Sequence, residues 1–337
     1  FVLLVAGGEL LVRGSVAIAE RIGVSPLIIG IVLVGFGTSM PELVISVQAS
    51  LAGSPGISIG NFVGSNISNI LLIVGISALL APLTVTSRAL KRDGGVVIAA
   101  SAAFTIFAFF SPLTRPIGLV FIGLLATYLI YAIRQERLEP EAGHSAAFEM
   151  SEAYDELMRN GDLAGAFRLK WSTRLGRMLP FLMALAGLGT IIFGGRLLVD
   201  AAVSLAQQIG VSEAVIGLTV VAIGTSLPEL VTSLVAAYRG HSDVAVGNVL
   251  GSCVYNILGI GGVVGLLAPT AIPEQIIYYD NFIMLAAALA LVVCASNGGR
   301  ITRFEGAAML IAYMGYIASL WPCLLYTSDA ADDTQFV

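Results

Sequence analysis

The chain has 337 residues, of which 57% are hydrophobic and only 12% carry a charge, against about 25% in ordinary globular proteins. This composition excludes a soluble globular domain and a nucleic-acid-binding protein, and it predicts a protein embedded in the lipid bilayer. The formal net charge of −5 defines no partner, and the three cysteines follow no disulfide or metal-ligand spacing.

Long apolar runs separated by short polar breaks recur along the chain, and each is long enough to cross a hydrocarbon core of roughly 30 Å as a helix. They predict an all-α membrane protein with ten transmembrane helices. The expected spans are 1–20, 25–52, 59–81, 94–111, 116–133, 178–207, 212–237, 245–268, 276–295 and 304–322. A polar segment at 134–177 divides them into two sets of five, and residues 323–337 read as a polar tail that is disordered or not native.

One segment occurs twice. Gly-Thr-Ser-Met-Pro-Glu-Leu at 37–43 returns as Gly-Thr-Ser-Leu-Pro-Glu-Leu at 224–230, and 23 of the 47 positions of 37–83 are identical in 224–270. The chain is therefore an internal duplication of residues 1–133 and 178–322, most alike over about 25–82 and 212–269. Because each repeat holds an odd number of spans, we expect the second repeat to cross the membrane upside down relative to the first. This inverted-topology plan is typical of secondary transporters.

The basic residues predict the orientation. If the 134–177 loop is cytoplasmic, 14 of the 17 Lys and Arg residues lie on the cytoplasmic side. Cytoplasmic loops carry such an excess of positive charge. We therefore expect both termini outside and the long loop in the cytoplasm. The expected location is the plasma membrane.

Each repeat places one carboxylate inside an apolar run, Glu42 in the first and Glu229 in the second. A charged group at the bilayer centre costs roughly 2.5–3.5 kcal/mol on insertion scales, so its duplication calls for a function. Pro41 and Pro228 deprive the preceding turn of backbone donors and free its carbonyls. Hydroxyl groups surround the same turn, at Thr38, Ser39, Thr225 and Ser226. We expect the two glutamates to face each other and bind a cation.

A second motif follows, Gly-Asn-x-x-Gly-Ser-x-x-x-Asn at 60–69 and again at 247–256. Its glycine pairs allow close helix packing, which alone is a common structural role. The motif also keeps Ser65 and Asn69, and Ser252 and Asn256, each pair four residues apart on one helix face. We expect these side chains to complete an oxygen shell of the kind that Ca²⁺ prefers.

Charge balance indicates antiport. Two carboxylates neutralise one Ca²⁺ or about two Na⁺, so a single pocket holds one load at a time and alternating access exchanges them. The alternatives are a Ca²⁺/H⁺ exchanger, since buried glutamates can carry protons, and a passive cation channel, which usually needs rings of acids from several subunits. Neither an enzyme activity nor a cofactor is expected; Ca²⁺ and Na⁺ are transported ions, and the oligomeric state is undetermined by the sequence.

The paired motifs resemble the α-repeats of the prokaryotic branch of the sodium/calcium exchanger family, over about residues 1–322. The resemblance implies ten helices, with the first and sixth as long gating helices, and Glu42 and Glu229 shared by calcium and sodium. It also implies sodium contacts from the carbonyls of Gly35 and Ala222. Where several relatives carry Asp, this chain has Asn256, which disfavours a potassium-dependent or strongly proton-coupled exchanger.

Overall fold

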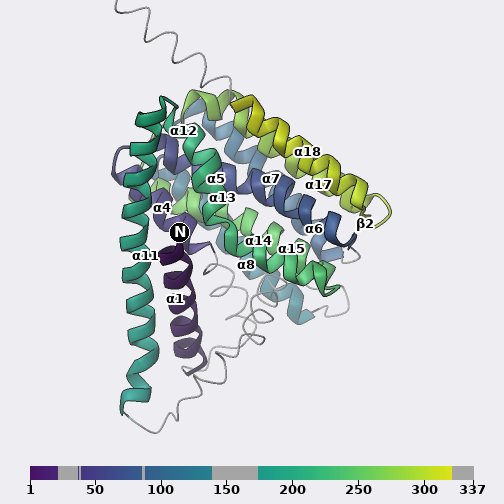
Figure 1. Cartoon of the computed structure of the whole chain (residues 1–337). Coiled ribbons are helices and arrows are strands. Elements are labelled where there is room, and N and C mark those ends of the chain that lie inside the picture. The colour runs from purple at the N-terminus through teal and green to yellow at the C-terminus, as the bar shows by residue number, and fades with distance from the viewer. Residues whose placement is uncertain (22–36, 38, 86–87, 139–173, 321–337) are drawn as a thin grey trace, which may run out of the picture.

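The structure, a computed structural model, describes residues 1–21, 37, 39–85, 88–138 and 174–320. Most of these residues are helical (Figure 1). The α-helices are α1 (Val2–Arg21), α4 (Met40–Leu51), α5 (Pro55–Ile67), α6 (Gly75–Leu80), α7 (Arg88–Phe110), α8 (Arg115–Leu138), α11 (Arg174–Ile209), α12 (Glu213–Ile216), α13 (Ala222–Thr225), α14 (Leu227–Tyr238), α15 (Ser242–Val254), α16 (Gly261–Leu267), α17 (Asn281–Ser296) and α18 (Arg303–Leu320). The π-helices are η2 (Ser68–Val74), η4 (Gly217–Val221), η5 (Tyr255–Ile260) and η6 (Ile276–Asp280).

Helices with matching positions in the two repeats have matching bounds. Helices α4 and α14 both have 12 residues, α5 and α15 both have 13, and each pair is offset by the 187 residues of the sequence repeat. The π-helices η2 and η5 begin at equivalent positions, Ser68 and Tyr255. The duplication therefore sets the local conformation as well as the residue types.

Helices α1 and α11 form a long pair at one side of the molecule (Figure 1). They run antiparallel, because Gly7 faces Ile191 whereas Gly14 faces Ala184. A Cβ added at Gly187 would lie 2.6 Å from the carbonyl oxygen of Gly7, so the two backbones touch. Small residues permit such close approach between membrane helices.

The most deeply buried membrane-crossing segments are α5–η2–α6 and α15–η5–α16. In an apolar stretch of 18 residues within each segment, 78% and 89% of the stretch is buried inside the protein. Helix α5 packs on α12 and η4 of the other half. A Cβ at Gly60 would lie 2.9 Å from the carbonyl oxygen of Ala214, and one at Gly64 would lie 2.5 Å from that of Leu218. The expected close approach at these two glycines is confirmed.

Two short strands were not predicted. Strands β1 (Leu83–Thr84) and β2 (Arg300–Ile301) pair antiparallel, with Leu83 opposite Ile301. An isolated bridge joins Leu113 to Thr270. Each of these pairings links the segment after the third span of one repeat to the segment after the fourth span of the other, so they tie the two halves together at two places.

Six of the described helices are long and apolar enough to cross a membrane, and a seventh span is obtained if the bent pair Glu213–Thr225 and Leu227–Tyr238 is counted as one. The described helices all lie within or overlap the predicted spans. The count of ten spans stays a prediction. Most of the polar segment at 134–177 and all of the tail at 323–337 lie outside the described residues.

Candidate cation site

Glu42 and Glu229 occupy the first turns of α4 and α14, directly after the motif prolines. Ser39 and Ser226 precede these helices in nearly the same backbone conformation, with φ −87° and ψ 9° and with φ −81° and ψ 9°. At the second of these turns the helix axis bends by 49°, which agrees with the expected interruption at Pro228. Acids are common in first helical turns because the helix dipole stabilises them, but surface capping does not account for two carboxylates that are only 1% exposed.

The two motifs meet in space although they lie far apart in the sequence. The hydroxyl of Ser226 donates a hydrogen bond of 3.4 Å to Oε1 of Glu42. The Glu42 and Glu229 carboxyl groups are close enough to interact electrostatically. The acid-bearing turns of the two repeats therefore lie next to each other.

The predicted shell is rich in buried polar atoms that have no partner among the described residues. Natively buried polar groups are nearly always hydrogen-bonded, so an unpartnered set marks a place where a ligand or water belongs. The unpartnered atoms are the hydroxyls of Ser39, Ser65 and Ser252, the side-chain amides of Asn69 and Asn256, Oε2 of Glu42 and both carboxylate oxygens of Glu229. All seven of these residues are at most 1% exposed.

The two asparagines of this set lie where the α-helix widens. Asn69 is the second residue of η2 and Asn256 is the second residue of η5. Single π-turns inside α-helices are frequent at functional sites because they redirect side chains and loosen the backbone ladder. The sequence did not predict these π-turns.

Thr225 and Ala222 are engaged with each other. The Thr225 hydroxyl is 3.2 Å from the carbonyl oxygen of Ala222, which also accepts from the backbone amide of Ser226 at 3.1 Å. The Ala222 carbonyl is therefore not free in this structure, and an ion could use it only through an exchange of partners. The predicted contributors Gly35 and Thr38 lie outside the described residues.

Two asparagines were missed as site residues, although they belong to the second repeated motif. Asn61 and Asn248 donate hydrogen bonds to the backbone carbonyls of Glu42 and Glu229, at 3.0 Å and 3.2 Å. The signal that could have found them was their identity in both repeats. Their partners could not be read from the sequence, because the carbonyls belong to another helix.

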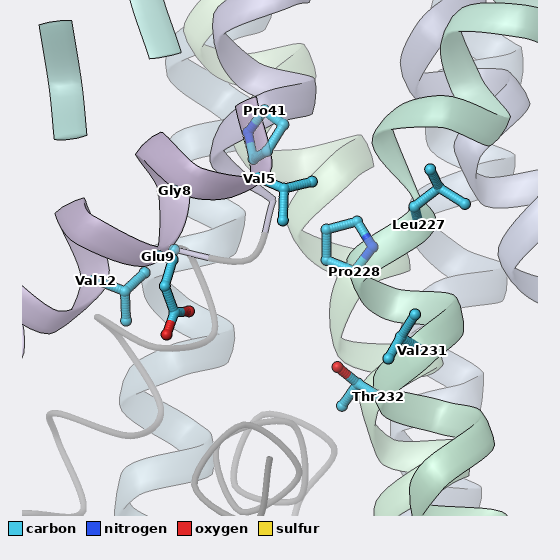
Figure 2. A pocket seen from close by; sticks show the side chains of 10 residues that line it. Val5, Gly8, Glu9, Val12, Pro41, Leu227, Pro228, Val231 and Thr232 are labelled. Atoms are coloured by element: carbon cyan, nitrogen blue, oxygen red, sulfur yellow. The ribbon is translucent and has the colours of Figure 1, made fainter. Parts of the chain in front are cut away.

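A cavity of about 260 Å³ lies beside both motif prolines. Figure 2 shows Val5, Glu9 and Val12 of α1 on one side of it and residues of α14 on the other, including Pro228 and Thr232. Glu9 is paired with Arg13 one turn along α1, where Nε of Arg13 donates to Oε1 of Glu9 at 2.6 Å.

A second cavity of about 470 Å³ lies on another side of α1, lined by residues of α1, α4, α8, η5 and α16. Val12 and Gly37 line both cavities. Both cavities are therefore lined in part by α1 and by the first motif.

The donor set is chemically uniform. Within the described part of the chain, no three of His, Cys, Asp or Glu gather as a metal cluster. The site combines two carboxylates with hydroxyl and amide groups, and oxygen donors of this kind suit hard cations rather than zinc or copper.

The fold and site define a membrane protein in which two repeats each contribute one buried acid to a shared polar centre. The chain belongs to the sodium/calcium exchanger protein family, whose model matches residues 1–134 and 179–321.

Two relatives and one solved structure match this chain along most of their length. The putative antiporter CaxA of Alkalimonas amylolytica is 34% identical, with 94% of each chain covered. The sodium/calcium exchanger MaX1 of Methanosarcina acetivorans is also 34% identical, with 95% of this chain and 96% of that protein covered. A structure of the sodium-calcium exchanger NCX_Mj soaked with Na⁺ and Sr²⁺ is 30% identical over 94% of this chain and 95% of that chain, with a TM-score of 0.60.

Proposed function

We propose that the protein is a secondary active antiporter that exchanges Na⁺ for Ca²⁺ by alternating access and exports Ca²⁺ from the cytoplasm. The observation that carries the proposal is the meeting of Glu42 and Glu229 in one buried centre with unpartnered oxygens around them. A buried pair of like charges is costly unless a cation or proton compensates it. The family supplies the ions: relatives along the whole chain are named for sodium/calcium exchange.

The proposed ligands follow the geometry of the shell. Glu42 and Glu229 are shared by both ions. The neutral oxygens come from the side chains of Thr38, Ser39, Thr225, Ser226, Ser65, Asn69, Ser252 and Asn256 and from the carbonyls of Gly35 and Ala222. Ca²⁺ takes six to eight such oxygens, and two carboxylates balance its charge. Two negative charges cannot balance Ca²⁺ and Na⁺ together, so the loads compete.

The proposed topology has ten spans in two inverted halves, a cytoplasmic 134–177 loop and both termini outside. The antiparallel contact of α1 with α11 supports it, because these are the first helices of the two repeats. Helix α1 lines both cavities beside the first motif, which supports the proposal that movement of this helix opens and closes the site.

The test is Ca²⁺ uptake into membrane vesicles that are loaded with Na⁺ and diluted into Na⁺-free buffer. Uptake should require the outward Na⁺ gradient and should be absent in K⁺-loaded vesicles. Uptake driven instead by an imposed pH gradient would identify a Ca²⁺/H⁺ exchanger, and uptake without any gradient would identify a channel. Either result would refute Na⁺/Ca²⁺ exchange.

The site is tested by Glu42→Gln and Glu229→Gln, which are nearly isosteric and each remove one of the two charges. Each should abolish exchange while the protein is still inserted and folded. Glu274→Gln, which neutralises an exposed acid outside the site, is the control and should exchange like the parent protein. Normal exchange by both site variants would refute the assignment.

A further inference from the structure

Asn61 connects three elements through a single buried side chain. Its amide nitrogen donates to the backbone carbonyl of Glu42 at 3.0 Å and to the hydroxyl of Ser46 at 3.0 Å. Its amide oxygen accepts from the hydroxyl of Thr225 at 3.1 Å. Asn61 lies on α5 and is fully buried. One amide therefore joins α5 both to α4 of its own repeat and to α13 of the other.

The two hydrogen bonds donated by the asparagine amide nitrogen form a clamp on the acid-bearing helix, and the second repeat contains the same clamp. The amide nitrogen of Asn248 on α15 donates to the carbonyl of Glu229 at 3.2 Å and to the hydroxyl of Ser233 at 2.9 Å. Ser233 is the repeat equivalent of Ser46, as Asn248 is of Asn61. The two copies of the duplication have diverged at many positions, and both keep this pair of hydrogen bonds. Its retention in both indicates a constraint that belongs to the site rather than an accident of packing.

The clamp holds the peptide group of each acid rather than its carboxylate. A glutamate in the first turn after a helix break has a less restrained backbone, because the preceding residues do not continue the same helix. A side-chain donor on its carbonyl fixes that peptide group, and the peptide group fixes the starting point of the carboxylate. Thr225 lies next to Ser226, whose hydroxyl contacts the Glu42 carboxylate. Asn61 thus holds both the Glu42 backbone and the segment of the opposite repeat that contacts the Glu42 side chain.

A neighbouring asparagine provides the contrast within the chain. Asn66 is also on α5 and fully buried, but its amide nitrogen donates to the carbonyl of Phe62 in its own helix at 2.6 Å. Its repeat equivalent is Cys253, which is equally buried. The second repeat therefore dispenses with an amide at the position of Asn66 and retains one at the position of Asn61.

We propose that Asn61 and Asn248 are positioning residues that set the two carboxylates at the separation a shared cation requires. The inference rests on the proposed function, because it concerns the affinity of that same site. Removing a group that orients a metal ligand typically lowers the affinity for the metal by about 10–100-fold. The expected effect of Asn61→Ala is a rise in the KM for Ca²⁺ within this range, with a parallel rise for Na⁺.

The experiment compares Asn61→Ala with Asn66→Ala in the full chain, reconstituted into vesicles. Both variants delete a buried amide from α5, so both should lower the thermal unfolding temperature. Only Asn61→Ala should raise the KM for Ca²⁺, while Asn66→Ala should stay within about twofold of the parent protein. If Asn61→Ala does not fold, Asn248→Ala tests the same role in the other repeat. Ser46→Ala is a milder variant, because it removes only one of the two acceptors of the Asn61 amide nitrogen.

Equal KM changes in the two alanine variants would overturn the inference and make the clamp a packing feature. A lower maximal rate for Asn61→Ala with an unchanged KM would overturn it as well. These outcomes differ from a failure of the proposed function, in which the parent protein itself would show no Na⁺-dependent Ca²⁺ uptake.

Discussion

The contact between α1 and α11 gives a prediction whose magnitude can be worked from the structure. A methyl group at Gly187 would lie 2.6 Å from the carbonyl oxygen of Gly7 and still closer to the backbone nitrogen of Leu11. Ordinary contact begins near 3.4 Å, so Gly187→Ala forces α1 away by about 0.8 Å or more. Added atoms in a well-packed contact typically cost about 1–3 kcal/mol.

Gly189 is the matched control, because it lies on the same helix, is exposed, and has no atom within 4 Å of an added Cβ. Alanine should be neutral or mildly stabilising there, since glycine within a helix is less favourable than alanine by about 0.8–1.0 kcal/mol. The assay is thermal unfolding of the purified variants, with Na⁺-driven Ca²⁺ uptake measured in parallel. Gly187→Ala should lower the unfolding temperature and slow exchange, and Gly189→Ala should do neither. Equal unfolding temperatures for the two variants would refute the close antiparallel contact.

Two further substitutions test other contacts with internal controls. Tyr316→Phe removes the hydroxyl that donates to Oδ1 of buried Asp280 at 2.9 Å, so unfolding should be easier by about 1–3 kcal/mol. Tyr313→Phe removes a buried hydroxyl that has no hydrogen-bond partner among the described residues, and it should be nearly neutral. Similar losses in both variants would contradict the Tyr316 assignment. Gly64→Ala places a Cβ 2.5 Å from the Leu218 carbonyl oxygen. It should destabilise more than Gly261→Ala, whose Cβ comes no closer than 3.4 Å to its nearest neighbour, the Phe121 ring. The reverse order in thermal unfolding would show that α5 and η4 are not in close contact.

The sequence predicted the centre of the site because two strong local signals coincide there. A purely structural role rarely explains a carboxylate within an apolar run directly after a proline. This combination occurs once in each repeat, at Pro41–Glu42 and at Pro228–Glu229. Their positions in the first turns of α4 and α14, and the contact of Ser226 with Glu42, agree with that prediction. The ion pair of Glu9 and Arg13 is equally local, because the two residues lie four positions apart on one helix.

The features that the sequence did not predict all depend on which segments become neighbours. The Asn61 clamp requires knowledge of the carbonyl that faces it. The pairing of β1 with β2 joins Leu83 to Ile301, which is 218 positions further along the chain. The widening of the helix at Asn69 and Asn256 leaves no residue signature, because a π-turn is selected by packing rather than by propensity. Periodicity and repetition identify residues under constraint, and only the assembled fold shows which partner imposes it.

The electrostatics of the centre favour exchange over leak. Within the described residues, neither Glu42 nor Glu229 forms an ion pair with Lys or Arg, and both are almost fully buried. Burying an uncompensated charge carries an effective penalty of several kcal/mol per ion. An empty site that closed with both acids ionised would therefore bear two such penalties, whereas a site loaded with Ca²⁺, with Na⁺ or with protons would not. A conformational change that seals the site from water is then favoured only when an ion is bound. If the two acids bind the cargo as proposed, they would also hinder the unloaded protein from crossing between its two access states, and this coupling is what separates an antiporter from a pore.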